Sequence, residues 1–243
     1  MLAIIALSAA VAIAPLDAPA IFARATKAHG GEAWARAKTL TLSGHAIFYA
    51  PTGGTVASRA DDYRMWRVYD PARSASHAAE GKVRIIAKSG QKQLFTVGYD
   101  GVMTWNDKGV VPKAEADTYW ASNFGFGIIR HAADAGFKAE RMPDDWVANH
   151  PLYMLRLTDP EGGVTLFGID QATYAIRTMA FATPRGWHER IYDDFVRLKN
   201  PDWLQARHVT LRYNGVKQNE VFWTRTIVNA AIPESLFAAV KSP

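Results

Sequence analysis

The sequence contains no cysteine. Disulfide bonds are therefore excluded, and so is attachment of a lipid through an N-terminal cysteine. Basic residues outnumber acidic ones by 28 to 23, but no run of five or more basic residues concentrates this charge. Nucleic acid is accordingly not an expected partner, because its recognition relies on a clustered basic patch.

Catalytic motifs are also scarce. The sequence has no G-x-S-x-G nucleophile elbow, no glycine-rich phosphate loop, no G-x-G-x-x-G and no H-E-x-x-H. The segment Ser89-Gly90-Gln91-Lys92 matches S-x-x-K in letters, but that motif needs a helix to place the lysine beside the serine. Ser89-Gly90 predicts a hairpin turn instead. We therefore expect no catalytic residue and no cofactor.

Candidate metal ligands are not grouped either. No two of the seven histidines have short metal-ligand spacing, so we expect each of them at the surface or at a rim, and no metal site. They are His29, His45, His77, His131, His150, His188 and His208.

Three pairs of acidic residues are adjacent in the sequence. Neighbouring residues on a strand point to opposite faces, so such a pair cannot chelate a metal unaided, and we expect these charges at turns or edges. These pairs are Asp61-Asp62, Asp144-Asp145 and Asp193-Asp194.

The first residues have the pattern of an export signal. Met1 to Ala14 are uncharged and apolar, but too few to span a bilayer, which takes about 20 residues. Small residues at Ala10-Val11-Ala12 and at Ala18-Pro19-Ala20 offer two cleavage sites. We expect residues 1–20 to be a signal peptide, without assigning its exact cleavage site. Residues 21–243 are expected to form one domain. The expected mature protein is a soluble periplasmic monomer without a transmembrane segment.

The stretch from Pro151 to Thr183 contains three β-type runs separated by two short turns, Asp159–Gly163 and Asp170–Thr173. An antiparallel sheet that is wet on one side alternates between apolar and polar residues. Here both faces are apolar, as Tyr153 and Met154 illustrate for the first run. Two arrangements fit this pattern: helices on one face with a loop or rim on the other, or a curved sheet around an apolar cavity.

Two helical segments interrupt the β pattern. Asp17 predicts the cap of an N-terminal helix that ends at Gly30-Gly31. Apolar residues recur at helical spacing within residues 113–136 and predict two short helices or a kinked one. The predicted fold is α+β and mainly β: a single large curved antiparallel sheet, a half-barrel of about ten or eleven strands. The N-terminal helix and the mid-chain helical insertion are expected on its concave face.

Aromatic residues are abundant, with eight Trp, nine Tyr and eleven Phe. Ordinary core packing accounts for such side chains, but they also line pockets for apolar ligands. A concave aromatic face can bind acyl chains by burial alone, at about 0.8 kcal/mol per CH₂ group. The predicted ligand-binding residues are Trp66, Trp105, Trp120, Phe124, Phe126, Ile128, Phe181 and Trp223.

Several segments together resemble the LolA-like superfamily of bacterial envelope proteins. They are the helix ending at His29-Gly30-Gly31 with Trp34 next, the strand Leu40–Phe48, and the meander from Tyr153 to Arg177. This superfamily includes the periplasmic lipoprotein carrier, LppX-type lipid-binding lipoproteins and RseB-type stress sensors. The resemblance implies a half-open antiparallel barrel whose helices close an apolar cavity. It also implies a non-enzymatic carrier or sensor for lipid or lipoprotein.

Three functional hypotheses follow. The first is a periplasmic carrier that binds acyl chains, lipid or lipoprotein in an apolar cavity. The second is an envelope sensor or adaptor whose partner is a protein. The third is a hydrolase acting on an apolar substrate, for which His131 is a candidate acid or base.

Overall fold

The computed structural model describes residues 16–123 and 126–239. The helical elements are α1 (Ala18–His29), α2 (Glu32–Ala35), α3 (Lys113–Asn123) and the 3₁₀ helices η1 (Phe126–His131) and η2 (Glu234–Leu236). The first half of the sheet consists of β1 (Thr39–Tyr49), β2 (Val56–Val68), β3 (Lys82–Ser89), β4 (Lys92–Tyr99), β5 (Thr104–Asn106), β6 (Gly109–Val110) and β7 (Lys138–Arg141). The second half consists of β8 (Asp145–Val147), β9 (His150–Thr158), β10 (Val164–Asp170), β11 (Ile176–Thr183), β12 (Gly186–Lys199), β13 (Asp202–Tyr213) and β14 (Val216–Val228).

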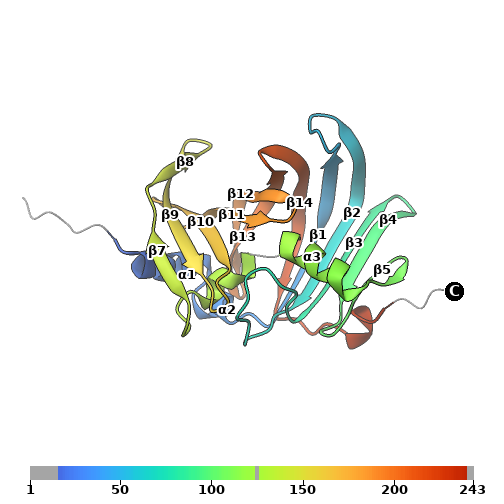
Figure 1. Cartoon of the computed structure of the whole chain (residues 1–243), viewed down its shortest axis with the longest axis horizontal. Helices are drawn as coiled ribbons and strands as arrows, with labels where there is room; N and C mark the ends of the chain where they lie inside the picture. The colour runs from blue at the N-terminus through green and yellow to red at the C-terminus, as the bar shows by residue number, and fades with distance from the viewer. Residues whose placement is uncertain (1–15, 124–125, 240–243) are drawn as a thin grey trace, which may run out of the picture.

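All strands belong to one sheet that curves into an open half-barrel (Figure 1). The strand order is β6-β5-β4-β3-β2-β1-β14-β13-β12-β11-β10-β9-β7, with β8 paired to β9, and the pairs are antiparallel. The predicted fold class is confirmed, but the sheet has 14 strands instead of about ten or eleven. The additional strands β6, β7 and β8 have two to four residues, too few for a detectable alternation of apolar and polar side chains.

The sheet bends at Gly44, where the first strand meets the last. The register of β1 against β14 shifts between Ser43 and Gly44, which marks a β-bulge. A Cβ atom on Gly44 would lie 1.9 Å from the carbonyl oxygen of Phe222. Only glycine therefore allows this close approach of the two strands at the bend.

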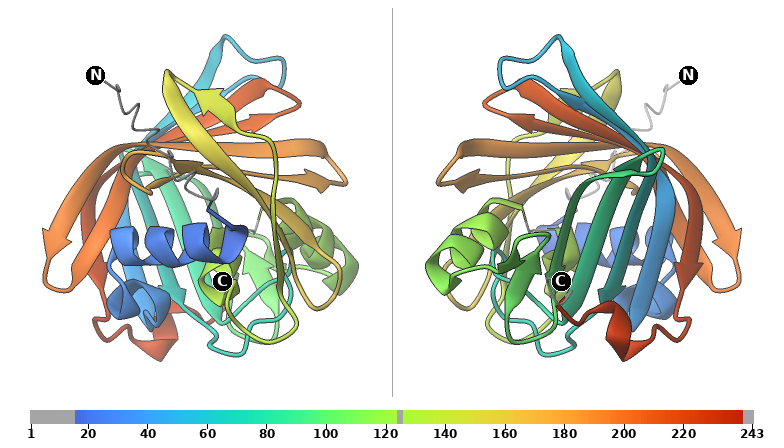
Figure 2. Two further views of the ribbon diagram at one scale, coloured as in Figure 1. Left: turned by 90° about the vertical axis from the view of Figure 1, so that its left-hand side faces the viewer. Right: turned by 90° about the vertical axis from the view of Figure 1, so that its right-hand side faces the viewer.

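Helix α1 lies under the arch of the sheet (Figure 2). Asp17 caps it by accepting a hydrogen bond from the backbone N–H of Ala20 at 2.8 Å, and Gly30 ends it with φ = 130°. Its apolar face is buried against the concave side, where the rings of Phe22 and Phe167 meet edge to face at 6.2 Å. The cap means that cleavage after Ala20, one of the two expected signal-peptide sites, would remove the first turn of α1.

The mid-chain insertion consists of α3 followed by η1. Of the two predicted arrangements, the structure therefore has two short helices and not one kinked helix. Trp120 on α3 is buried, and its Nε1–H donates to the hydroxyl of Thr104 on β5 at 2.7 Å. Tyr213 on β13 donates from its hydroxyl to the carbonyl oxygen of Ser122. The insertion is therefore tied to both arms of the curve, on the concave face, as the sequence predicted.

The loop of residues 69–81, named the strap below, joins the two halves of the sheet. It leaves β2, crosses the open side of the curve (the teal loop at the lower centre of Figure 1) and returns to β3. The Asp159 carboxylate at the end of β9 accepts from the backbone N–H of Ser76 at 2.6 Å. His77 stacks on Phe181 of β11 with ring centroids 4.1 Å apart. The strap therefore closes the half-barrel from one side.

Two histidines are exceptions to the expected surface or rim positions. His29 at the end of α1 is 3% exposed, and His188 on β12 is fully buried. The prediction was wrong for both, because a neutral imidazole can be buried when the fold gives it hydrogen-bond partners, which His188 has at both ring nitrogens and His29 at Nε2. His29 Nε2 accepts from the backbone N–H of Ile176 at 2.9 Å, which ties α1 to β11.

Asp159 provides a test of the strap. Its carboxylate also accepts from the backbone N–H groups of Glu161 at 2.9 Å and Gly163 at 2.7 Å. Asp159→Ala leaves three N–H groups without this acceptor, and we expect the free energy of unfolding to fall by about 2–4 kcal/mol. Urea unfolding measures this change. Asp107→Ala, at an exposed turn position, is the control, and equal stability of the two variants would contradict the role of Asp159.

Candidate ligand-binding cavity

A cavity of about 250 Å³, named the inner cavity, lies between the concave face of the sheet and its helices. Strands from β1 to β4 and from β12 to β14 form most of its wall, and the helices, the strap and β11 contribute the remaining residues. Its volume is near the lower end of the range of about 300–1,000 Å³ that is typical of small-molecule sites. The two-residue period of the strands directs every second side chain into this space.

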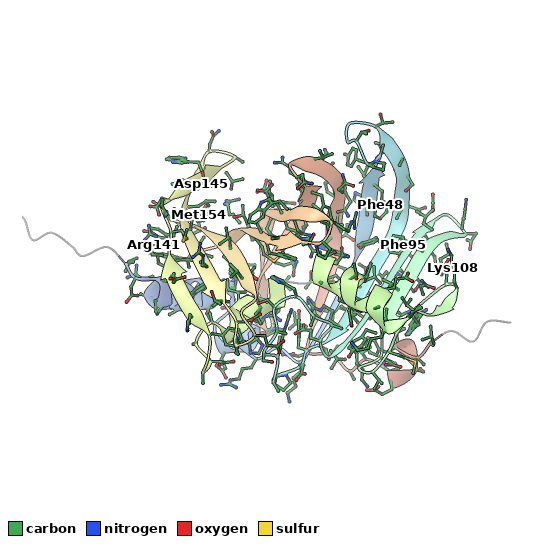
Figure 3. The ribbon with its side chains drawn as sticks, viewed as in Figure 1. Phe48, Phe95, Lys108, Arg141, Asp145 and Met154 are labelled. Carbon is green, nitrogen blue, oxygen red and sulfur yellow. The ribbon has the colours of Figure 1, made fainter. Side chains whose placement is uncertain are left out.

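Aromatic and aliphatic side chains make up most of the inner cavity. Phe48 on β1 and Phe95 on β4 lie in the same arm of the sheet (Figure 3), with ring centroids 5.8 Å apart. Tyr63 contacts both rings edge to face and lies 5.4 Å from Trp223. The other apolar or aromatic wall residues are Trp34, Leu40, Leu42, Met65, Tyr69, Ile85, Tyr119, Trp120, Ile176, Tyr192, Phe195, Trp203, Leu204, Ala206, Val209, Leu211 and Val221.

Three arginines, Arg67, Arg130 and Arg190, also line the inner cavity, whereas no aspartate or glutamate is among its described wall residues. Arg67 forms an ion pair with the buried carboxylate of Glu80, which also pairs with Arg73 at 3.0 Å. Arg190 donates from Nε to His188 at 3.1 Å and from Nη2 to the carbonyl oxygen of Asn123 at 2.8 Å. The wall therefore combines apolar surface with positive charge.

The buried titratable groups of this region are held in their neutral forms. Burial, followed by repulsion from Arg130 and Arg197, lowers the pKa of His29 to about 3. Burial and the charge of Arg190 lower the pKa of His188 to about 2. Burial also raises the pKa of Tyr63 and of Tyr192 to about 12, so their hydroxyls stay protonated. At neutral pH the arginines therefore supply the positive charge of the inner cavity.

A second cavity of about 850 Å³, named the outer cavity, lies beside the first. It is bounded by α1, α2, η1 and the start of the strap, and its wall contains more charged side chains than that of the inner cavity. The charged or titratable wall residues are Glu32, Arg36, Lys38, Asp70, Glu80, Arg130, His131 and Asp134. Arg130 and Tyr69 belong to the walls of both cavities and thus mark their junction.

The predicted ligand-binding residues occupy different places. Trp120 and Trp223 lie in the wall of the inner cavity. Trp66 and Trp105 point to the convex face. Trp66 lies between the cavity residues Met65 and Arg67 on β2 and therefore faces the opposite side of the sheet. Trp105 is covered by Arg84 and by the carbonyl oxygen of Phe237.

The other predicted site residues pack into the core or lie outside the description. Ile128, a residue of η1, is fully buried in the core. Phe181 is packed between His77 and His188. Neither is among the described residues that line the two cavities. Phe124 and the side chain of Phe126 lie outside the described part of the chain.

Sequence reasoning missed the arginines of the cavity. A signal for Arg67 was present, because Tyr63, Met65 and Arg67 alternate along β2 and therefore share one face. No comparable signal existed for Arg130, which comes from η1 and reaches the cavity only through the packing of the insertion.

The described residues contain neither a cluster of metal-ligating side chains nor a helix that could span a membrane. No three His, Cys, Asp or Glu side chains within residues 16–123 and 126–239 come together as metal ligands. His131 pairs with Asp134 at 2.8 Å at the edge of the outer cavity. Among the same residues, no helix has the length and apolar character needed to cross a bilayer.

Comparisons with known proteins show the fold. No protein-family model matches the sequence, and no curated protein does. A LolA superfamily protein from Nitrosomonas europaea superposes with a TM-score of 0.54 at 10% identity, covering 92% of this chain and 98% of that one. A Vibrio parahaemolyticus domain described as an outer membrane lipoprotein-sorting protein has a TM-score of 0.53 at 10% identity, covering 89% and 94%.

A DUF1329 family protein from Desulfovibrio piger gives a TM-score of 0.53 at 8% identity, covering 91% of this chain and 97% of the other. At these identities the likeness concerns the fold, and each superposition spans nearly the whole of both chains. The chain thus has the fold of LolA superfamily proteins, and the resemblance predicted from the sequence is confirmed at this level.

Acid sensitivity follows from the buried histidine of α1. The pKa of His29 falls from 6.5 to about 3 on folding, so the unfolded chain binds the proton more tightly. Stability should therefore decrease as the pH falls from about 6.5 toward 3, with a contribution of up to about 1.4 kcal/mol per pH unit from this residue. In His29→Gln the side chain can still accept from Ile176 but does not titrate. We expect a shallower loss of stability in urea unfolding between about pH 7 and about pH 4.

His45→Gln provides the control, because His45 is exposed on β1. This variant should keep the wild-type dependence of stability on pH. If His29→Gln also kept the wild-type slope, protonation of His29 would not contribute to acid unfolding.

Proposed function

We propose that this protein is a non-enzymatic binding or carrier protein of the bacterial periplasm that holds an acyl chain, as part of a lipid or lipoprotein, in its inner cavity. The observation that carries the proposal is the cavity itself, an apolar and aromatic space enclosed by the sheet and its helices. Each methylene group transferred from water into such a space contributes about 0.8 kcal/mol to binding. Binding of this kind needs no catalytic group.

The solved structures support the proposal. One of those with this fold is described as an outer membrane lipoprotein-sorting protein, and another as a LolA superfamily protein. A function in the sorting or carriage of lipid-bearing molecules is therefore consistent with the fold. The apolar N-terminal segment of the sequence supports export, since it has the pattern of a signal peptide.

Filling the inner cavity tests the site. Val209 on β13 lines the cavity, and Val209→Trp would put an indole ring into it. We expect at least about tenfold weaker binding of palmitate, measured as displacement of Nile red fluorescence, at a cost in stability of no more than about 1–3 kcal/mol.

The matched control is Thr224→Trp, because Thr224 follows the cavity residue Trp223 on β14 and is exposed on the opposite face. This variant should bind palmitate as the wild type does. Unchanged affinity in Val209→Trp would show that the acyl chain lies elsewhere, and a wild type that binds no palmitate would contradict the proposed function.

The mature N-terminus follows from the cap of α1. Cleavage after Ala12 keeps Asp17 and its hydrogen bond to Ala20, whereas cleavage after Ala20 destroys the first turn. Loss of such a cap costs about 1 kcal/mol. We expect the intact mass of protein purified from an envelope fraction to correspond to a chain that begins before Asp17. A mass corresponding to a start at Ile21 would contradict this expectation, and an unprocessed chain would contradict export by this signal.

A further inference from the structure

The junction between the two cavities is formed by Arg130 and Tyr69. On one side lies the inner cavity, whose wall is mainly apolar. On the other side lies the larger outer cavity, with both acidic and basic side chains in its wall. A molecule that occupied both spaces would need an apolar part, a polar part, and a connection that passes Arg130.

Three aromatic rings hold the guanidinium of Arg130. Its Cζ atom lies 4.2 Å from the ring centre of Tyr69, 4.9 Å from that of Trp34 and 5.4 Å from that of Trp203. These distances are within the range of cation–π attraction. The rings come from the strap, from α2 and from β13, so the position of the guanidinium is fixed by three separate parts of the fold.

Hydrogen-bonding capacity of Arg130 is left unused. Neither Nε nor Nη1 has a hydrogen-bond partner among the described residues, although both atoms are inaccessible to solvent. The described carboxylates form no ion pair with it, whereas Arg67 and Arg73 share Glu80. A buried donor without an acceptor is costly, and more so when it is charged. Arg130 as a whole is half-buried and lines both cavities, so an anion that reaches the accessible part of its side chain meets a cation without a carboxylate partner among the described residues.

On the inner side of the junction, the charged wall residues are all basic. Arg67 and Arg190 also line the inner cavity, and no aspartate or glutamate is among its described wall residues. Their summed potential attracts an anion and disfavours a cation in the same space. The repulsion that Arg130 contributes to the lowered pKa of His29 agrees with this charge distribution.

We propose, building on the proposed function, that Arg130 binds the anionic head group of the ligand. The ligand would then be an anionic amphiphile: its acyl chain lies in the inner cavity, and its carboxylate or phosphate pairs with Arg130 at the junction. Arginine is suited to both groups, because its planar fork makes two parallel hydrogen bonds to a carboxylate or a phosphate. Any further part of the head group extends into the outer cavity.

A comparison of four probes tests this assignment in the wild-type protein. Palmitate, palmityl phosphate and palmityl alcohol share one chain and differ in the head group, and inorganic phosphate is a head group without a chain. Each competes with Nile red for the cavity. We expect palmitate and palmityl phosphate to bind about tenfold to a hundredfold more tightly than palmityl alcohol. Inorganic phosphate should not displace the dye, because it lacks the chain.

Variants then identify the residue. Arg130→Gln should remove the preference for the anionic probes and leave the affinity for palmityl alcohol unchanged, and Arg130→Lys should keep part of the preference. Arg207→Gln is the matched control, because Arg207 is exposed, pairs with Asp194 at 2.7 Å and is not among the described residues that line either cavity. It should retain the full wild-type preference.

Other outcomes would overturn the assignment. Equal affinity of the wild type for palmitate and palmityl alcohol would do so while leaving the proposed function intact. An equal loss of affinity for both probes in Arg130→Gln would show that Arg130 only supports the packing of η1. Displacement of the dye by inorganic phosphate alone would identify an anion site without a lipid. If no amphiphile bound the wild type, the proposed function and this assignment would both fail.

Discussion

Incomplete filling of the concave face is the constraint on which the rest of this structure depends. A sheet of 14 strands curves around a 12-residue helix, an 11-residue helix and shorter helical turns. The bulge at Gly44 contributes to the curvature, and further register shifts occur between other strand pairs. Strands paired by backbone hydrogen bonds do not collapse onto a small core. Space therefore remains between the sheet and the helices, and the side chains that face it are those of the strands.

Buried charge holds the parts that border this space. Glu80 on the strap lies between Arg67 of β2 and Arg73 of the strap, and a Cβ atom on Gly127 of η1 would approach Arg73 to 2.7 Å. Buried ion pairs add little net stability, because both groups must leave water. They do fix geometry, since removal of one partner leaves an uncompensated charge. The cluster thus positions η1, and η1 carries Arg130 to the junction of the two cavities.

Much of the fold could be predicted from the sequence, because long strands and capped helices have local signals. The strand Leu40–Phe48 and the helix cap at Asp17 are examples, and both elements are found where they were expected. The edge strand β7, with the sequence Lys-Ala-Glu-Arg, has no such signal, since an exposed edge is stabilised by pairing and not by apolar burial.

The residues of the cavity were harder to predict than the fold. Trp66 and Trp223 are equally aromatic, and only the register of their strands decides that Trp223 faces the cavity and Trp66 the convex side.

The distribution of charge also sets how a bound amphiphile is oriented. An anionic group placed among Phe48, Phe95 and Trp223 would lose its hydration without gaining hydrogen bonds from these rings. At the junction the same group meets the guanidinium of Arg130, which three aromatic rings already hold in place, so little ordering of this side chain is needed on binding. The chain-inward orientation is therefore the one that satisfies both ends of the ligand. Burial of the acyl chain does not distinguish one chain-bearing molecule from another. The fixed charge at the junction therefore determines which of these molecules are retained.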